Sequence, residues 1–463
     1  MNPLIFREYD IRGIADHDLT DEVAEYIGRA FGTLVRRSGS ERVVLGHDVR
    51  LSSPRLHARV AEGLKACGLE VLDLGFMVTP GVYFAAVRLE AGGSLQVTGS
   101  HNPPEYNGFK MTLQDGAVYG ERIQEIRRLI ETRDWESGAG SVRLVPILDE
   151  YVTAITSRVR LRGHPRIVVD AGNGTAGPVA LRVFEGIGCE VDPLYCEPDG
   201  AFPNHLADPT VPAFMADLIR RVVDHGADLG IGLDGDGDRI GLVDSGGRMI
   251  FGDQLLALFA RDVIERQGPA EIIFDVKCSQ GLVEDIEAHG GIPRMWKTGH
   301  SLIKSEMKRT GAPIAGEMSG HMFFSEGWFG FDDAIYAGAR LLGILDRWEC
   351  PLSELVDTIP AYVSTPEIRI GCADEDKFQV VEEITRRFKA RGDVRVIDLD
   401  GARVVFPDGW GLLRASNTQP VLVLRFEGQS EEAMARVRAA FTSILEEFPS
   451  VALEELDAGG AGH

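Results

Sequence analysis

Short apolar strands alternate with helices along most of this 463-residue chain, and that alternation constrains the fold more than any other feature. The first unit has strands at 43–46 and 70–74, which are followed by helices at 54–66 and 80–89. Strands that are separated by helices pair in parallel, within sheets whose faces the helices cover. The sequence therefore predicts an α/β protein built around parallel or mixed sheets.

Two further units of this kind follow, and then the pattern changes. After about residue 366, closely spaced strands lie between two helices, which is typical of a smaller α+β domain with antiparallel strands. The second unit has strand 166–170, helix 178–187 and strand 228–233; the third has strand 271–275, helix 280–289 and strand 314–317; the last part has helix 376–390, strands 403–406, 411–415 and 421–427, and helix 431–446.

The length of the chain fits three or four domains, at roughly 100–200 residues each. We expect three similar α/β domains and one C-terminal α+β domain. They are domain I (1–146), domain II (147–250), domain III (251–362) and domain IV (363–463). The glycine-rich tail at 458–463 is predicted to be disordered.

Composition and charge exclude several classes of partner. The net charge of −23 disfavours nucleic acid or an anionic membrane as the main partner. No apolar run is long enough to span a bilayer, and the N-terminal residues lack the pattern of a signal peptide. The six cysteines form no C-x-x-C pair, so neither a zinc site nor a disulfide framework is indicated. We expect a cytoplasmic protein with reduced cysteines and no obligate protein partner.

One hydroxyl, that of Ser100, stands among turn-forming residues directly after the apolar run 94–97. A hydroxyl on a rigid turn at the end of a strand is well placed to act as a nucleophile, although an isolated Ser-His pair is usually an ordinary turn. The known nucleophile pattern G-x-S-x-G does not fit, because Thr98 and Asn102 occupy its glycine positions. The phosphate-binding pattern G-x-x-x-x-G-K-[ST] is also absent from the chain.

Three aspartates alternate with glycines directly after strand 228–233. Alternate side chains of an extended segment point the same way, so the three carboxylates converge and repel each other unless a cation neutralises them. Oxygen ligands favour Mg²⁺ or Ca²⁺, and the EF-hand pattern fails because Arg239 and Ser245 stand where it needs Gly and Glu. The sequence predicts a hard cation on Asp234, Asp236 and Asp238.

Two more polar loops carry groups that suit a sugar phosphate. In loop 316–321, Glu317 and Ser319 are flanked by glycines and can hydrogen-bond adjacent sugar hydroxyls. Loop 414–420 combines the Arg414 guanidinium with hydroxyls, an amide and backbone N–H groups, a combination typical of a phosphate site. Each loop taken alone would also suit an ordinary turn.

The segment 172–177 fits the dinucleotide pattern G-x-G-x-x-G, follows a strand and precedes a helix. An NAD-linked dehydrogenase is therefore an open alternative. That interpretation explains none of the other loops, so we interpret the glycines as a site of tight packing between a strand and a helix.

These stretches together resemble the α-D-phosphohexomutase superfamily. The Ser100 loop, followed by Asn107-Gly108-Phe109-Lys110, is similar to the phosphoserine loop of the phosphomannomutase/phosphoglucomutase branch. The resemblance covers nearly the whole chain and implies four domains around one cleft, three of them alike. The phosphoglucosamine branch has Gln at the position of Met318 and Ala at that of Gly237, so both residues favour the hexose branch.

The resemblance implies reversible phosphoryl transfer between O1 and O6 of glucose and mannose phosphates. It implies a phosphoserine enzyme, a hexose 1,6-bisphosphate intermediate, Mg²⁺ as cofactor and glucose 1,6-bisphosphate as activator. A phosphoglucosamine mutase and a Mg²⁺-dependent sugar phosphatase remain alternatives.

The resemblance also implies roles for individual residues. Phospho-Ser100 would complete the metal site, Glu317 and Ser319 would contact O3 and O4 of the sugar, and the Arg414 loop would hold the phosphate that is not reacting. Either Lys110 or His300 could act as general acid or base if its pKa moves toward neutral. The implied catalytic residues are Ser100, Lys110, Arg239 and His300; the implied substrate contacts are Tyr9, Arg12, Lys277, Glu317, Ser319, His321, Arg414, Ser416, Asn417 and Thr418.

Overall fold

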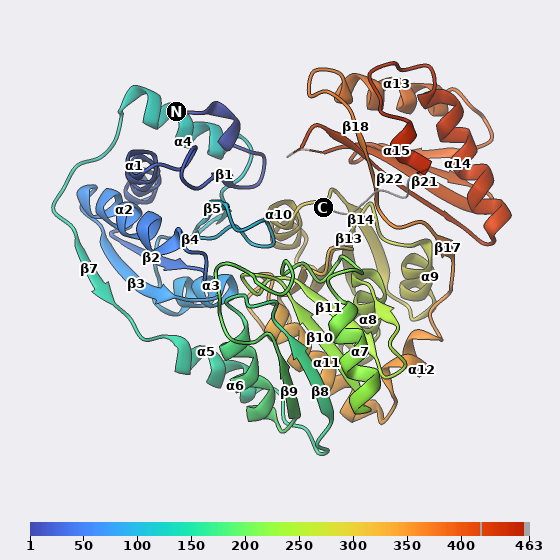
Figure 1. Ribbon diagram of the computed structural model, residues 1–463, viewed down its shortest axis with the longest axis horizontal. Coiled ribbons are helices and arrows are strands. Elements are labelled where there is room, and N and C mark those ends of the chain that lie inside the picture. Colours follow the sequence, from blue (N-terminus) through green and yellow to red (C-terminus); the bar gives the residue numbers. More distant parts are fainter. Residues whose placement is uncertain (417–418, 458–463) are drawn as a thin grey trace.

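Four β-sheets, one within each predicted domain, organise the described part of the chain in the computed structural model (Figure 1). The structure describes residues 1–416 and 419–457. The predicted phosphate contacts Asn417 and Thr418 and the tail at 458–463 lie outside the described residues. The domain boundaries remain predictions.

The first sheet belongs to domain I and has the order β1-β5-β4-β2-β3-β7, with β6 paired to β5. Strands β2, β3, β4 and β7 pair in parallel, whereas β5 runs antiparallel to both β4 and β1. The elements are η1 (Pro3–Ile5), β1 (Ile11–Ile14), α1 (Asp21–Arg37), β2 (Arg42–His47), α2 (Ser53–Ala66), β3 (Glu70–Phe76), α3 (Thr79–Arg88), β4 (Gly93–Val97), β5 (Tyr106–Leu113), β6 (Gly116–Ala117), α4 (Glu121–Thr132) and β7 (Ser141–Leu144).

The sheets of domains II and III repeat this plan in a shorter form, with the orders β12-β11-β10-β8-β9 and β14-β13-β15-β16. Domain II contains α5 (Leu148–Thr156), β8 (Arg166–Asp170), α6 (Gly177–Ile187), β9 (Glu190–Leu194), α7 (Ala216–His225), β10 (Leu229–Leu233), β11 (Ile240–Asp244) and β12 (Met249–Ile250). Domain III contains α8 (Gly252–Gln267), β13 (Glu271–Asp275), α9 (Gln280–Ala288), β14 (Ile292–Trp296), α10 (His300–Thr310), β15 (Ile314–Gly316), β16 (Met322–Phe324), α11 (Ala334–Trp348) and α12 (Leu352–Val356).

In each of these three sheets, one parallel strand continues into an antiparallel hairpin with the next strand of the chain. The hairpins are β4–β5, β10–β11 and β15–β16. The loops that close them carry Ser100, the three aspartates and Glu317, so three loops that the sequence singled out separately occupy equivalent places in three similar domains. Strand β15 ends at Gly316, one residue earlier than predicted, and Glu317 therefore belongs to the loop.

Domain IV has an entirely antiparallel arrangement among its described strands, in the order β17-β22-β21-β20-β19 with β18 paired to β22. This confirms the predicted α+β domain. Its elements are β17 (Val363–Ser364), β18 (Ile368–Gly371), α13 (Lys377–Lys389), β19 (Arg395–Ile397), β20 (Ala402–Phe406), β21 (Gly409–Ala415), β22 (Val421–Gly428), α14 (Glu431–Leu445) and α15 (Glu454–Asp457).

Local capping explains where several helices begin. The side chains of Thr20, Ser279 and Ser430 each accept a hydrogen bond from a backbone N–H in the first turn of α1, α9 and α14. Such a cap satisfies an N–H group that the helix itself leaves without a partner. No helix among the described residues is long and apolar enough to cross a membrane.

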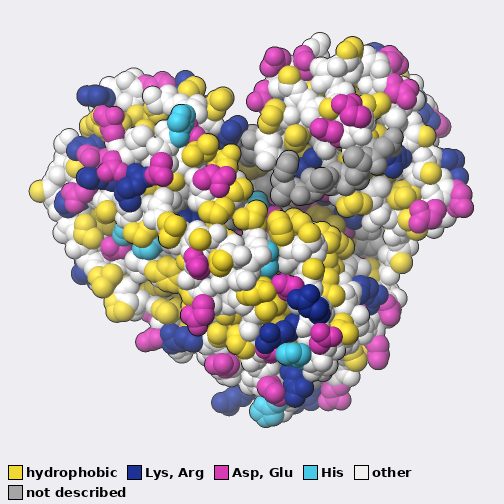
Figure 2. Space-filling model, viewed as in Figure 1, with side chains coloured by type: hydrophobic (Ala, Val, Ile, Leu, Met, Phe, Trp, Pro, Cys, Tyr) yellow, Lys and Arg dark blue, Asp and Glu magenta, His cyan; other side chains and the backbone are white. Residues whose placement is uncertain are grey.

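The largest hydrophobic core cluster joins three domains, whereas domains I and IV also have core clusters of their own. One core cluster is continuous through domains I, II and III and includes Val44, Phe184 and Phe324. Domain IV has its own core, in which the rings of Phe388 and Phe441 lie 4.7 Å apart. Figure 2 shows the surface hollowed between the lobe of domain I and the lobe of domain IV.

Candidate active site

Ser100 follows β4 in a left-handed backbone conformation with φ of 48°, which is uncommon for a residue with a side chain. The Thr98 hydroxyl accepts a hydrogen bond from the Ser100 backbone N–H at 2.9 Å. This bend directs the buried Ser100 hydroxyl toward domain II, where it donates to Asp234 Oδ2 at 2.8 Å. The structure thus brings together two residues from separate domains that the sequence predicted to share a site.

The three aspartates are fully buried, and one carboxylate oxygen of each lies within 4.8 Å of the others. Gly235 is required between them, because a Cβ atom there would lie 2.4 Å from the Ser100 carbonyl oxygen. One oxygen of Asp236 and one of Asp238 have no hydrogen-bond partner within the described structure. Converging carboxylates with unbonded oxygens fit a hard divalent cation.

Lys110 extends from β5 into this group, with Nζ 2.8 Å from Asp236 Oδ2 and 2.5 Å from Asp238 Oδ2. Burial favours the neutral amine, but the neighbouring carboxylates outweigh it and raise the Lys110 pKa well above its usual value. Burial, with Asp238 and Asp236 nearby, also raises the pKa of Asp234 well above its usual value. In this structure the Lys110 pKa therefore moves away from neutral rather than toward it, and the acid or base role of this residue stays a prediction.

His300 begins α10 and stacks on His321, with the ring centres 5.4 Å apart. Burial and the charge of Lys304 lower the His300 pKa well below its usual value, which favours the neutral imidazole and makes it a weaker base. Arg239 donates from Nε to His321 Nε2 at 3.0 Å. The other ring nitrogen of His321, Nδ1, lies 3.0 Å from Asp332 Oδ2.

Glu317 lies at the turn between β15 and β16 and is almost fully buried. Its carboxylate accepts a hydrogen bond from the Gly299 N–H at 2.6 Å, and burial raises its pKa. Ser319 lies on the same turn and is partly exposed. Lys277 follows β13 and places Nζ 3.1 Å from Glu367 of domain IV, so it contacts both domains III and IV.

Arg414 is the penultimate residue of β21 and pairs with Asp400, whose Oδ2 also accepts from the Thr298 N–H at 3.0 Å. The Tyr9 hydroxyl donates to the Thr298 carbonyl oxygen at 2.8 Å. These contacts gather side chains of domains I and IV around one turn of domain III. Ser416 follows Arg414 and is buried, with its hydroxyl accepting from the Gln419 N–H at 3.2 Å.

Arg12 lies on β1 beside the Ser100 loop and donates to Asn102 Oδ1 at 2.5 Å. It also forms an ion pair with Asp10. Among the residues that the structure describes, the predicted substrate contacts therefore come from domains I, III and IV. The predicted catalytic residues come from domains I, II and III.

Several charged residues around these groups were missed by the sequence analysis, namely Asp48, Arg50, Asp332 and Asp400. Asp332 is fully buried and lies 2.9 Å from Lys304 Nζ as well as beside His321. The sequence carried a usable signal for Asp48 and Arg50, since charged residues stand directly after a buried strand there. It carried no comparable signal for Asp332 or Asp400.

The glycine motif at 172–177 packs against the aspartate loop and the neighbouring strand. Thr175 accepts a hydrogen bond from the Val49 N–H at 3.0 Å, and its own N–H donates to the Gly235 carbonyl at 2.8 Å. A Cβ atom at Gly177 would lie 2.1 Å from the Cys196 carbonyl oxygen. The motif is therefore closely packed against the aspartate loop and the segment that follows β9, and its interpretation as a packing site stays a prediction.

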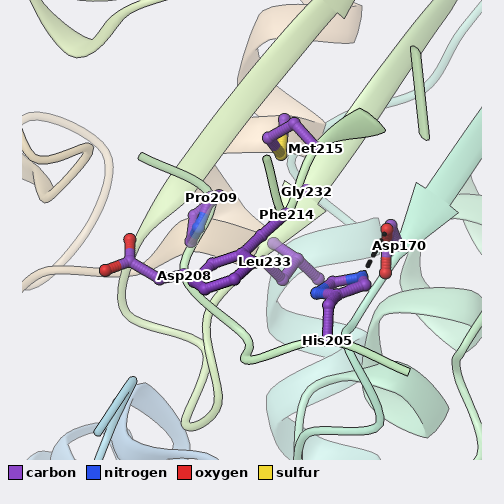
Figure 3. Close-up of a pocket in the computed structure, with 8 residues that line it drawn as sticks. All are labelled: Asp170, His205, Asp208, Pro209, Phe214, Met215, Gly232 and Leu233. Carbon is purple, nitrogen blue, oxygen red and sulfur yellow. Dashed lines mark hydrogen bonds and ion pairs between the residues drawn. The ribbon is translucent and has the colours of Figure 1, made fainter. Parts of the chain in front are cut away.

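A small cavity in domain II lies behind the aspartate loop (Figure 3). Its space of about 10 Å³ suits one water molecule and excludes a sugar phosphate. His205 faces Asp170 Oδ2 through Nε2 at 3.1 Å and the Leu206 carbonyl through Nδ1 at 2.9 Å. Burial lowers the pKa of this imidazole, but the bond to Asp170 outweighs it, and the net effect raises the pKa.

The fold and the site together define an α/β enzyme of the phosphohexomutase class. N-acetylglucosamine-phosphate mutase, which belongs to the α-D-phosphohexomutase superfamily, shares the fold with a TM-score of 0.58 at 14% identity, over 87% of this chain and 76% of that chain. Models of the phosphoglucomutase/phosphomannomutase family match all four parts of the chain: α/β/α domain I at residues 3–137, domain II at 149–247, domain III at 251–362 and the C-terminal domain at 367–444.

The chain belongs to the phosphoglucomutase/phosphomannomutase family of isomerases. It is 49% identical to a phosphomannomutase/phosphoglucomutase of Pseudomonas aeruginosa over 441 residues, or 95% of each chain. It is 46% identical to a phosphoglucomutase of Neisseria gonorrhoeae over 448 residues, or 96% of this chain and 97% of the other. A family protein from Burkholderia thailandensis matches with a TM-score of 0.92 at 44% identity, over 98% of this chain and 100% of that chain.

Proposed function

We propose that this isomerase transfers a phosphoryl group reversibly between O1 and O6 of glucose and mannose phosphates through phospho-Ser100. The observation that carries the proposal is the 2.8 Å contact between Ser100 Oγ and Asp234, inside the buried three-aspartate group. Relatives named phosphomannomutase/phosphoglucomutase support the same reaction.

The bonds made and broken in each half-reaction balance. Phospho-Ser100 donates its phosphoryl group to the free O1 or O6 hydroxyl of a hexose monophosphate. The bond from serine oxygen to phosphorus breaks and the serine oxygen takes a proton from an acid of the enzyme. A bond from sugar oxygen to phosphorus forms, and the sugar hydroxyl proton passes to a base of the enzyme. The resulting 1,6-bisphosphate reorients in the cleft, returns its other phosphoryl group to Ser100 and leaves as the isomer.

The chain supplies both charge and a proton acceptor for this transfer. Asp234, Asp236 and Asp238 would hold Mg²⁺, which would supply neutralisation of the charge on the transferring phosphoryl group. Lys110 adds a fixed positive charge beside these carboxylates. Lys110 and His300 remain the two candidates for general acid and base, although burial and neighbouring charges shift the pKa of each away from neutral.

Substrate binding is assigned to the loops of domains III and IV. Glu317 and Ser319 would contact O3 and O4, which glucose and mannose present identically because the two sugars differ only at C2. Arg414, with Ser416, Asn417 and Thr418, would hold the phosphate that is not reacting, by charge-assisted hydrogen bonds. Tyr9, Arg12, Lys277 and His321 would complete the contacts with the substrate, and Arg239 would act with Ser100 as a catalytic residue.

A coupled mutase assay with the 1-phosphates of glucose, mannose and glucosamine tests the proposal, with the intact mass of the enzyme measured in parallel. Glucose and mannose phosphates should react at rates within about tenfold of each other, because no assigned contact reads C2. Phosphate should be found on Ser100. Release of inorganic phosphate in excess of isomer would favour a sugar phosphatase, and a preference for glucosamine phosphate would favour a phosphoglucosamine mutase.

We infer a cytoplasmic location and no nucleic-acid partner. All six cysteines are free thiols, as a reducing compartment would keep them. The net charge of −23 repels nucleic acid outside the cleft. Fractionation of the source cells tests the location directly.

A further inference from the structure

The guanidinium of Arg50 lies directly beneath the Ser100 loop and has no exposed surface. Its Nη1 donates to the carbonyl oxygens of Pro103 at 2.6 Å and Tyr106 at 2.9 Å. Its Nη2 donates to the carbonyl oxygens of Ser100 at 2.7 Å and Asn102 at 2.5 Å. One side chain therefore binds four carbonyl groups within a single seven-residue loop.

Asp48 holds both Arg50 and the loop from the other side. Its Oδ2 lies 3.3 Å from Arg50 Nε and accepts from the Gly99 N–H at 3.1 Å. Its Oδ1 accepts from the Arg50 N–H at 3.0 Å and from the Ser53 hydroxyl at 2.5 Å. The ring of Phe202, from domain II, covers the guanidinium at 5.2 Å. The guanidinium is thus enclosed between two domains, and these contacts fix its orientation.

The Ser100 loop needs such support, because its central residue carries strain. A residue other than glycine with φ of 48° persists only where its surroundings hold it in place. The Ser100 carbonyl also faces Gly235 of the aspartate loop, where no space for a Cβ atom remains. A planar fork of N–H donors can span four carbonyl groups, whereas the single ammonium of lysine cannot.

We propose that Arg50 is the positioning residue of Ser100: it holds the Ser100 hydroxyl at the three-aspartate group in the geometry that phosphoryl transfer needs. Arg50 does not touch the substrate and acts only through the loop. This proposal rests on the proposed function of Ser100. Because Arg50 donates to none of the assigned substrate contacts, loss of Arg50 should lower the rate of phosphoryl transfer and leave substrate binding unchanged.

Arg50→Lys tests the proposal, with Arg340→Lys as the matched control. Arg340 is a buried arginine of α11 that donates to Asp262 at 3.0 Å and to the Glu326 carbonyl at 3.1 Å, and neither partner belongs to the candidate site. Three quantities are measured for each full-length protein. They are the rate of Ser100 phosphorylation by glucose 1,6-bisphosphate from intact mass, kcat and KM for glucose 1-phosphate, and Tm.

In Arg50→Lys, Ser100 phosphorylation and kcat should fall together by on the order of 10²-fold, because a misplacement of about 1 Å costs about that much. KM should stay the same. Arg340→Lys should lower Tm and leave phosphorylation and kcat unchanged. In Arg50→Ala, added guanidinium ion, below the concentration that unfolds the protein, should partly restore phosphorylation, while ammonium ion should not. If Arg50→Ala does not fold, Arg50→Lys decides the test.

Wild-type rates of Ser100 phosphorylation in Arg50→Lys would overturn the proposal. So would losses of kcat in Arg50→Lys and Arg340→Lys that simply follow their losses of Tm, because Arg50 would then be an ordinary stabilising residue. Failure of the proposed function is a separate outcome. It would appear as wild-type enzyme that catalyses the reaction without phosphate on Ser100, and it would remove both proposals.

Discussion

The two sides of the cleft are built in different ways. On the side of domains I and II, the Ser100 loop follows Val97 of a core cluster within domain I, and the aspartate loop follows Leu233 of the core cluster that joins three domains. Arg50 and Lys110 are buried on this side. On the other side, domain IV has its own core and meets domain III through a small cluster that includes Val276 and Trp410.

A buried arginine lies at each place, but the two make different attachments. Arg50 binds four carbonyl groups of one loop, whereas Arg403 stacks on Trp410 and donates to two carbonyl groups of domain III, those of Val276 and Cys278, both at 2.6 Å. The difference teaches that the hydroxyl proposed to react is fixed in place, while the loop proposed to hold a phosphate belongs to a separately packed domain. Such a division suits an intermediate that must be held while it turns.

Replacement of Ser100 should have the largest effect on activity, because its hydroxyl is the group proposed to carry the phosphoryl group. Ser100→Ala should lose all mutase activity and all covalent phosphate, and should keep its far-UV circular dichroism spectrum. A coupled assay and intact-mass measurement check both. Full activity in Ser100→Ala, or phosphate on another residue, would show that the reacting group does not lie on the Ser100 side of the cleft.

Loss of a carboxylate from the aspartate loop should have the next largest effect on activity. Asp234→Asn, Asp236→Asn and Asp238→Asn should each lower kcat by on the order of 10²–10³-fold, by analogy with other groups that stabilise a charged transition state. Isothermal titration calorimetry with Mg²⁺ should show weaker binding for each variant. Removal of the metal with a chelator should stop wild-type turnover, and added Mg²⁺ should restore it.

The exposed pair of Asp115 with Arg122 offers a control for these variants. Asp115→Asn removes an equal charge from domain I at a site without contact to the aspartate loop. Its kcat should match that of the wild type. Undiminished wild-type activity in chelator would show that the buried carboxylates serve Lys110 and not a metal.

Arg414→Ala should sharpen the contrast, because it weakens the grip on the phosphate and leaves the reacting centre intact. The bisphosphate should escape more often, so turnover should need added glucose 1,6-bisphosphate and phosphate on Ser100 should decline during catalysis. Arg414→Lys should recover part of the loss, since lysine lacks the planar fork of arginine. The exposed domain IV residue Arg436, which pairs with Asp408, gives the control Arg436→Ala. Normal kcat and KM in Arg414→Ala without added bisphosphate would show that loop 414–420 does not hold the phosphate.

The smallest expected effect is a pH dependence of stability within domain II. The His205 pKa is raised above 6.5 in the folded protein by its bond to Asp170, with the carboxylates of Asp208 and Asp217 nearby. Protonated His205 therefore stabilises the fold fully below about pH 6.5, and this contribution is lost as the pH rises through the raised pKa. Between pH 6 and pH 8, the free energy of unfolding measured in urea should fall more for the wild type than for His205→Gln. Equal losses in the two proteins would contradict this assignment.

Much of the fold could be predicted from the sequence, because its determinants are local. The predicted strands 166–170 and 271–275 coincide with β8 and β13, since short apolar runs bounded by turns are visible without tertiary contacts. The structure and the family models also confirmed the α/β class and the C-terminal α+β domain, and the comparisons with known proteins confirmed the family. The antiparallel partners β5, β11 and β16 were not predicted, because nothing local distinguishes an antiparallel partner from a parallel one.

The composition of each site loop was determined by the sequence alone, since turn chemistry and alternating carboxylates depend on near neighbours. Only the tertiary structure decided which groups face each other. Ser100 and Asp234 are 134 residues apart in the chain and 2.8 Å apart in space, because equivalent hairpins of two domains meet across one interface. That interface also buries Lys110 between carboxylates, which raises its pKa where the sequence allowed a shift toward neutral. Burial and charge in the folded site therefore set the chemistry of residues whose identity the sequence had already supplied.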